Sequence, residues 1–184
     1  LNTKATFETV TLHYDEIIKQ VLELKVDVGI VYDPMPHDDL INEPIIKGNF
    51  VVIAPRDYFP DKTSVNIEEI KTQPFIKITD KVGPRGPLGS KLEEYLLNNS
   101  ISLNPTFNTE TYQVALALVA KGMGMTITDR ISAESSAHSN IKILNLTPNL
   151  EFNLEIVYSK SNPLSLINKS FINFLRDFKY KNNA

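Results

Sequence analysis

The side chains that most often carry catalysis or bind metals are scattered along this sequence. The three histidines, His13, His37 and His138, lie far apart, and none of them belongs to a His-Glu-x-x-His zinc motif. Cysteine is absent, which excludes disulfides, thiolate metal sites and cysteine nucleophiles together. No Gly-x-Ser-x-Gly nucleophile elbow occurs, and no pattern pairs a serine with a histidine. The sequence therefore predicts no metal site, no cofactor and no enzymatic activity.

Two glycine-containing stretches have a superficial likeness to nucleotide-binding loops. The first, Gly83 to Lys91, has Ser before Lys, the reverse of the P-loop order, and its two prolines remove amide donors that a phosphate needs. The second, Gly122-Met123-Gly124, precedes a strand pattern and does not open a helix, so it is not a dinucleotide fingerprint. We interpret the second stretch as a helix C-cap followed by tight packing.

Polar side chains at the ends of predicted strands are better candidates for binding. The segment Ile78 to Gly86 joins a strand pattern to the start of a helix pattern, where free N–H groups favour anions. Thr79 adds a hydroxyl, and Arg85 adds a bidentate donor. Thr128 and Tyr32 end two further strand patterns, and ligands of open α/β sheets bind at such carboxyl ends. A surface loop with a solvated arginine is the alternative, and the residues alone leave both interpretations open.

Helix and strand patterns alternate along the chain, which favours an α/β architecture with mostly parallel sheets. Helices are predicted at Tyr14–Leu24 with Asp15 as N-cap, after Asn66, at Pro87–Asn98, at Thr111–Lys121, and after Asn162 with Pro163 in the first position. Strands are predicted at Thr6–Leu12, Val26–Tyr32, Leu40–Ile46, Phe50–Ala54, Phe75–Thr79, Pro105–Asn108, Met123–Thr128, Ile141–Leu146 and Phe152–Ser159.

Length and composition limit the classes of protein that fit. A chain of 184 residues forms one domain or two small lobes, and its 42% hydrophobic and 22% charged residues are ordinary for a folded soluble protein. The longest apolar run, Val114 to Ala120, is far shorter than the roughly 20 residues of a membrane span. The net charge is -3, whereas nucleic-acid-binding domains usually carry a basic face. We therefore expect no membrane partner and no DNA binding by this chain alone.

Several segments together resemble the effector-binding domain of LysR-type transcriptional regulators. The stretch Tyr112 to Asp129 (YQVALALVAKGMGMTITD) resembles the helix, Gly-x-Gly and strand signature of that family. Glu16 to Val31 (EIIKQVLELKVDVGIV) resembles its helix and following strand, although Leu24 stands where glycine is common. Glu43-Pro44-Ile45 followed by Phe50 to Pro55 is similar to the crossing strand. The resemblance covers nearly the whole chain.

The resemblance implies a two-lobed fold like that of type 2 periplasmic binding proteins, with residues 1–51 plus 147–184 in lobe I and 52–146 in lobe II. It implies that a small effector, for which a carboxylate would suit the helix N-terminus and Arg85, binds between the lobes. The implied ligand-binding positions are Tyr32, Thr79, Asp80, Lys81, Val82, Gly83, Arg85, Gly86, Thr109 and Thr128.

The same resemblance implies a cytoplasmic homodimer or homotetramer that contacts DNA only through a separate winged-helix domain. That domain is not found in the sequence, and neither are the family's first strand and helix of lobe I, which precede a segment like Thr6–Leu12. Either the chain is a fragment, or its lobe I is assembled differently.

Two other classes share part of the pattern. A solute-binding protein of a transport system has the same fold, and both Asp27-Val28-Gly29 and Gly122-Met123-Gly124 occur in that group too. An export signal upstream would favour it. An α/β enzyme could also alternate in this way, but it would need a converging nucleophile or acid–base pair, and none is recognisable in the sequence.

Overall fold

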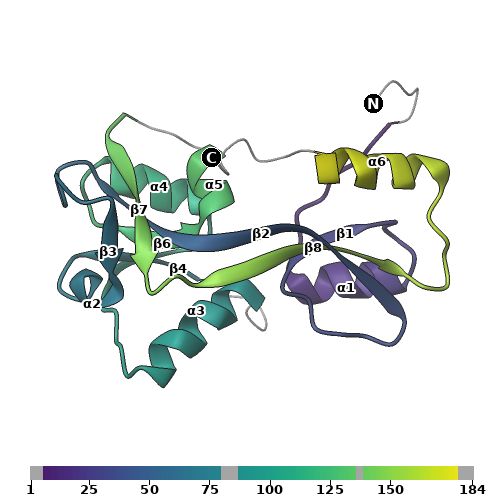
Figure 1. The fold of residues 1–184 in the computed structure, drawn as a ribbon, viewed down its shortest axis with the longest axis horizontal. Coiled ribbons are helices and arrows are strands. Elements are labelled where there is room, and N and C mark those ends of the chain that lie inside the picture. The colour runs from purple at the N-terminus through teal and green to yellow at the C-terminus, as the bar shows by residue number, and fades with distance from the viewer. Residues whose placement is uncertain (1–5, 80–86, 136–138, 178–184) are drawn as a thin grey trace. The chain divides into compact units, whose positions relative to one another are not determined.

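The computed structural model describes residues 6–79, 87–135 and 139–177 (Figure 1). The helices are α1 (Tyr14–Leu22), α2 (Ile67–Ile70), α3 (Pro87–Asn98), α4 (Tyr112–Ala120), α5 (Arg130–Ser135) and α6 (Leu166–Asp177). The strands are β1 (Gly29–Tyr32), β2 (Leu40–Pro55), β3 (Ser64–Asn66), β4 (Phe75–Ile78), β5 (Pro105–Thr109), β6 (Thr126–Asp129), β7 (Ile141–Thr147) and β8 (Glu151–Ser159). Within these ranges, no helix is long and apolar enough to cross a membrane.

The chain forms two compact units that share two strands. Unit 1 contains the residues up to Lys47 and those from Asn153 onward, and unit 2 runs from Gly48 to Phe152. Strands β2 and β8, which lie side by side in Figure 1, each begin in one unit and end in the other. The lobe limits expected from the resemblance, 51/52 and 146/147, stay a prediction.

Unit 1 is built on the pairing of β1 with β8. Gly29 lies opposite Val157 in an antiparallel ladder, and α1 packs against it so closely that a β-carbon on Gly29 would approach Ile17 to 2.7 Å. The prediction of a buried parallel strand from Val26 to Tyr32 was therefore wrong in direction and length. The turn after α1, where Leu24 has a φ of 57°, occupies the residues expected to start the strand.

Two further expectations in unit 1 were wrong. Residues 6–13 form no strand, although their β-branched composition predicted one for Thr6–Leu12. Composition favours a strand only where a neighbour supplies backbone hydrogen bonds, and no described ladder includes this segment. Phe7 instead stacks on Phe171 of α6 with ring centroids 5.2 Å apart. The helix α1 begins after His13, so Asp15 lies in its first turn and is not the N-cap.

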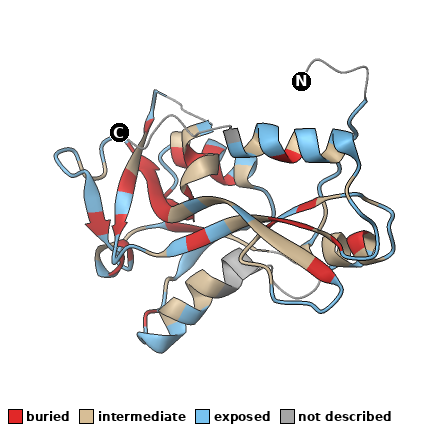
Figure 2. Cartoon of the chain, turned by 45° about the vertical axis from the view of Figure 1, so that its right-hand side comes forward, coloured by how far each residue is buried: buried red, intermediate tan, exposed pale blue. Residues whose placement is uncertain are grey.

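Unit 2 is built around the second half of β2. From Phe50 to Pro55 every residue of this strand is buried, and the strand lies between β6 and β7 in antiparallel ladders (Figure 2). Buried residues from β2, β4, α4, α5 and β7 form its core, namely Val51, Ile53, Ile76, Ala115, Leu116, Val119, Ala133 and Ile141. The predicted break at Gly48 does not occur, because β2 continues through it for 16 residues.

Among the described residues, the parallel pairs given by the ladders lie in unit 2. Strand β4 runs parallel to β5, and β3 runs parallel to β7. The expected α/β class is confirmed, but the sheets are mixed and not mostly parallel. The reason is that β2 carries the chain into unit 2 while β7 leads it towards the exit, so these neighbours run in opposite directions.

Candidate functional site

The carboxyl ends of three parallel strands lie next to one another in unit 2. Thr79, one residue past the end of β4, donates its N–H to the carbonyl of Thr109 at 2.8 Å. Thr109 ends β5, where it is the register partner of Ile78. On the other side of β4, Phe75 forms a parallel bridge with Met125, just before β6. Continuing this register by three residues brings Thr128 level with Ile78. The topology thus places Thr79, Thr109 and Thr128 at one edge of the sheet.

The end of β6 is buried and locally ordered by hydrogen bonds. Thr128 is 7% exposed, Asp129 is 4% exposed, and the Thr128 hydroxyl lies 3.4 Å from Asp129 Oδ2. Asp129 Oδ1 accepts the N–H of Ser132 at 2.7 Å, so this carboxylate caps the first turn of α5. Thr128 itself pairs with Val51 in the β2–β6 ladder, and the chain turns directly from β6 into α5 after Asp129.

A helix begins beside the same edge. Helix α4 starts after β5 with Thr111 as its N-cap, whose hydroxyl accepts the N–H of Val114 at 3.4 Å. The Thr109 hydroxyl accepts the N–H of Thr111, also at 3.4 Å. The positive end of the α4 dipole therefore lies beside the end of β5, where it favours an anion.

The ten expected site residues fall into three groups. Thr79, Thr109 and Thr128 are brought together in unit 2, as just described. Tyr32 is half-buried at the end of β1 and belongs to unit 1. The other six lie outside the described residues, and they are Asp80, Lys81, Val82, Gly83, Arg85 and Gly86.

Beside Tyr32, an acidic side chain has an altered proton affinity. Glu155 lies opposite Val31 in the β1–β8 ladder. Burial raises the pKa of the Glu155 carboxyl, and the charge of nearby Asp33 raises it further. Asp33 itself accepts the N–H of Asn153 at 2.8 Å, which holds the turn after β1 in place. No group of three or more His, Asp or Glu side chains in the described ranges is arranged to hold a metal.

Arg130 and its partners are not among the site residues expected from the sequence. Arg130 Nε donates to Asn49 Oδ1 at 3.0 Å, across 81 positions of sequence. Its terminal nitrogens donate to Glu134 and to Asn145. Asp129 before a short helical segment is a recognisable N-cap signal, but nothing in the sequence indicates the bond to Asn49.

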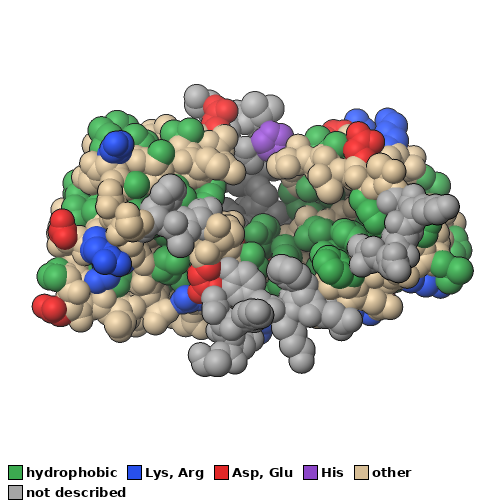
Figure 3. Space-filling view, turned by 90° about the horizontal axis from the view of Figure 1, so that it is seen from above, with side chains coloured by type: hydrophobic (Ala, Val, Ile, Leu, Met, Phe, Trp, Pro, Cys, Tyr) green, Lys and Arg blue, Asp and Glu red, His purple; other side chains and the backbone are tan. Residues whose placement is uncertain are grey.

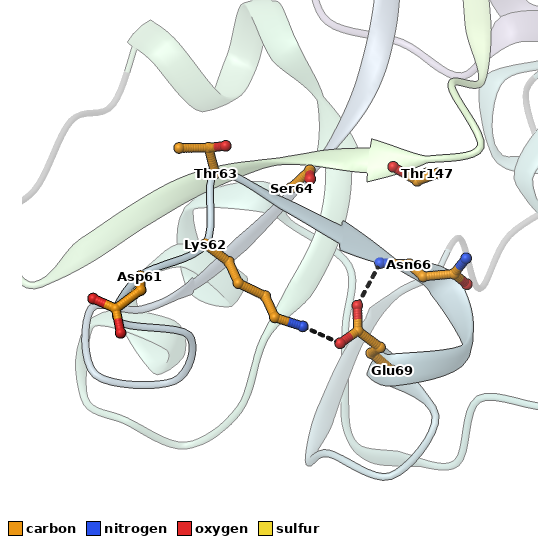
Figure 4. A pocket seen from close by; sticks show the side chains of 7 residues that line it. All are labelled: Asp61, Lys62, Thr63, Ser64, Asn66, Glu69 and Thr147. Atoms are coloured by element: carbon orange, nitrogen blue, oxygen red, sulfur yellow. Dashed lines mark hydrogen bonds and ion pairs between the residues drawn. The ribbon is translucent and has the colours of Figure 1, made fainter.

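A separate recess of about 450 Å³ lies where β3 and β7 end (Figure 4). Its lining residues are polar, and two of its three charged side chains are paired: Lys62 forms an ion pair with Glu69, which also accepts the N–H of Asn66 at 2.9 Å. The bond to Lys62 lowers the pKa of Glu69. The recess is open and its cation is already neutralised, so the strand ends of β4, β5 and β6 remain the stronger candidate.

Comparison with known proteins defines the class. The fold is that of LysR effector-binding domains, a type 2 periplasmic-binding-protein-like arrangement of sheets and helices. The family model for the LysR substrate binding domain matches residues 2–179, and the chain belongs to this family. The resemblance inferred from the sequence is confirmed, and it favours the regulator over the solute-binding and enzyme alternatives.

Relatives and solved structures agree with this assignment. The HTH-type transcriptional regulator DgcR of Pseudoalteromonas sp is 30% identical over 173 residues, which are 94% of this chain and 58% of that protein. The regulatory domain of CcmR from Synechocystis PCC6803, in complex with 2-PG, is 20% identical with a TM-score of 0.75, covering 92% of this chain and 81% of that one. The effector binding domain of QuiR with shikimate is 19% identical with a TM-score of 0.73, covering 90% and 78%. This chain thus spans about half the length of the curated regulators that it matches.

Proposed function

We propose that this chain is the effector-binding part of a LysR-type bacterial transcriptional regulator, and that a small anionic molecule binds at the strand-end site. The strand-end site consists of Thr79, Thr109 and Thr128 with the first turn of α4. The observation that carries the proposal is the meeting of three threonine-bearing strand ends with a helix N-terminus. Threonine hydroxyl groups at one edge, beside the positive end of a helix dipole, suit a carboxylate.

The proposed mechanism is a ligand-operated switch. The effector contacts lobe II (52–146) through the strand-end site and lobe I (1–51 and 147–184) through Tyr32. A ligand that makes contacts with both lobes binds a closed arrangement more tightly than an open one, and it shifts the population by this difference in affinity. Binding of this kind needs no nucleophile, metal or cofactor. The solved structures of the CcmR regulatory domain with 2-PG and of the QuiR effector binding domain with shikimate support an acidic effector here.

DNA contact is proposed for a separate winged-helix domain, with the whole regulator acting in the cytoplasm as a homodimer or homotetramer. The net charge of -3 supports the assignment of DNA binding to a separate domain. On the face drawn in Figure 3, the lysine and arginine side chains of the described residues lie in small groups among hydrophobic and neutral ones. The described residues on this face form no continuous basic track for a phosphate backbone.

Thermal unfolding with a panel of small acids tests the binding proposal. We expect shikimate, 2-PG or another carboxylate to raise the midpoint, and its uncharged amide to have no effect, because a ligand of the native state stabilises it in proportion to occupancy. Thr109→Val and Thr128→Val should each weaken binding about two- to tenfold, the range for one neutral hydrogen bond. Thr106→Val, at the other end of β5, is the matched control and should bind normally. Equal acid binding by all three variants would exclude Thr109 and Thr128 from the effector site.

The sequence-based expectation for Arg85 is tested with the same acid. Arg85→Ala should weaken its binding by about 1–3 kcal/mol in a calorimetric titration, which is the usual range for a charged hydrogen bond. Arg56, exposed in another part of unit 2, provides the control variant Arg56→Ala. An unchanged dissociation constant for Arg85→Ala would exclude Arg85 from the site.

A further inference from the structure

Strand β2 enters unit 2, and strand β8 leaves it, at residues that touch each other. Gly48 on β2 is the first residue of unit 2, and Phe152 on β8 is its last. A β-carbon on Gly48 would lie 2.5 and 2.6 Å from two carbons of the Phe152 ring, so the ring fills the space of a side chain. Phe152 is 1% exposed and meets Phe50 edge to face. We call Gly48 and Phe152 the joint.

Arg130 reaches the residue next to the joint. Its Nε donates to Asn49 on β2 at 3.0 Å, while its other nitrogens donate to Glu134 within α5 and to Asn145 on β7. A guanidinium is planar and holds its N–H groups in fixed directions, so three acceptors on three elements fix its orientation. A lysine ammonium carries the same charge without this geometry.

The backbone of Arg130 continues from the strand-end site. Thr128 donates to Asp129, and Asp129 caps the first turn of α5, whose first residue is Arg130. A change in the hydrogen bonding of the Thr128 hydroxyl therefore reaches the carboxylate that holds the start of α5. The chain of contacts runs from Thr128 through Asp129 and Arg130 to Asn49, which adjoins the joint.

We propose that Arg130 is a positioning residue that couples the strand-end site to the joint through its bond to Asn49. The inference rests on the proposed function, because it takes Thr128 as part of the effector site. When an effector engages Thr128, the start of α5 moves, and the Arg130 side chain carries that movement to Gly48. The ladder between β2 and β6 pairs Thr128 with Val51 and Asp129 with Phe50, and the Arg130 side chain adds a bond to Asn49, the residue next to Gly48.

A double-mutant cycle in NMR chemical shifts tests the coupling in the 184-residue chain without any effector. Thr128→Val removes the hydroxyl, and we expect it to shift the amide resonance of Gly48. In an Arg130→Met background the same shift should fall by at least half, since the connection is missing. Arg130→Lys keeps the charge but loses the planar guanidinium with its fixed N–H directions, and it should behave like Arg130→Met. If the charge alone carried the coupling, Thr128→Val would still shift the Gly48 amide resonance fully in the Arg130→Lys background.

Two further backgrounds separate the proposed route from a general loss of structure. Asn49→Ala cuts the bond next to the joint and should reduce the Gly48 shift as Arg130→Met does. Asn145→Ala removes a different Arg130 acceptor and should leave that shift intact. The inference is overturned if Thr128→Val does not shift the Gly48 amide resonance, or if it shifts that resonance equally in all backgrounds. If Arg130→Met does not fold, Asn49→Ala still tests the inference, because it removes the same bond from the Asn49 side. Because no effector is used, this outcome and that of the binding test are independent.

Discussion

Gly122 and Gly124 meet different conformational needs although a single residue separates them. Gly122 follows α4 with a φ of 77°, and a β-carbon there would meet nothing within 4 Å. Gly124 has a φ of 145°, and its β-carbon would lie 2.6 Å from the carbonyl oxygen of Pro74. The interpretation of this pair as a helix C-cap followed by tight packing is thereby confirmed. The close approach at Gly124 is what lets β6 lie beside β4.

Gly124→Ala should consequently destabilise the chain more than Gly122→Asn. The alanine meets both an unfavourable φ and a backbone oxygen that cannot turn aside, and we expect a loss of about 1–3 kcal/mol in the free energy of unfolding. Asparagine tolerates the left-handed conformation, and open space surrounds position 122, so its cost should stay below about 1 kcal/mol. Urea denaturation measures both values. Equal losses would contradict the role given to the Pro74 contact.

Among helices and strands, the attachment of α6 illustrates what holds an element in place. Tyr158 on β8 donates its hydroxyl to Glu43 Oε1 on β2 at 2.5 Å, and Arg176 of α6 donates to the other oxygen of the same carboxylate. Burial and, to a smaller extent, the bond to Glu43 together raise the pKa of Tyr158 to about 12. One carboxylate thus ties the C-terminal helix to two strands of unit 1.

This attachment predicts a loss of stability in alkali. The pKa of Tyr158 lies higher in the folded chain than in the unfolded chain, so its contribution is fully present below about pH 10 and is lost as the pH rises towards about 12. Urea denaturation of the wild type and of Tyr158→Phe at pH 9, 10 and 11 measures the difference. The wild type should lose more stability than the variant. Tyr58→Phe removes an exposed tyrosine hydroxyl and is the control. Parallel curves for the wild type and Tyr158→Phe would refute the assignment.

Caps and hydrophobic periodicity in the sequence predicted the presence of helices and strands better than they predicted where these elements end and which strands they pair with. Pro87–Asn98 was predicted to the residue, and the Asn66 cap is confirmed, with the side chain of Glu69 completing a capping box. Helix α6 begins at Leu166 and not after Asn162, because Ser165 accepts the N–H of Asn168 and competes as the cap. The short α5 was missed, since six residues carry too little periodicity to be recognised.

For the chain as a whole, the acidic balance predicts its behaviour towards DNA. With a net charge of -3, the 184-residue chain should not bind a labelled random duplex at 50 mM salt, because it offers too few cations to release the counterions of the phosphates. Fluorescence anisotropy measures this, and a basic protein of similar size serves as the positive control. Saturable binding that weakens steeply as salt rises would contradict the proposed division of labour between domains.

The sequence by itself determined the class of this protein and the approximate places of its elements. Hydrophobic period, caps and glycine positions act over a few neighbouring residues, so they can be recognised without knowing the fold. Only the tertiary structure decided that β2 is one strand through Gly48, that β1 runs antiparallel to β8, and that Arg130 bonds Asn49. These features join residues far apart in the chain. Their pairing depends on how the whole chain buries its apolar surface and satisfies its hydrogen bonds, which no short window of sequence contains.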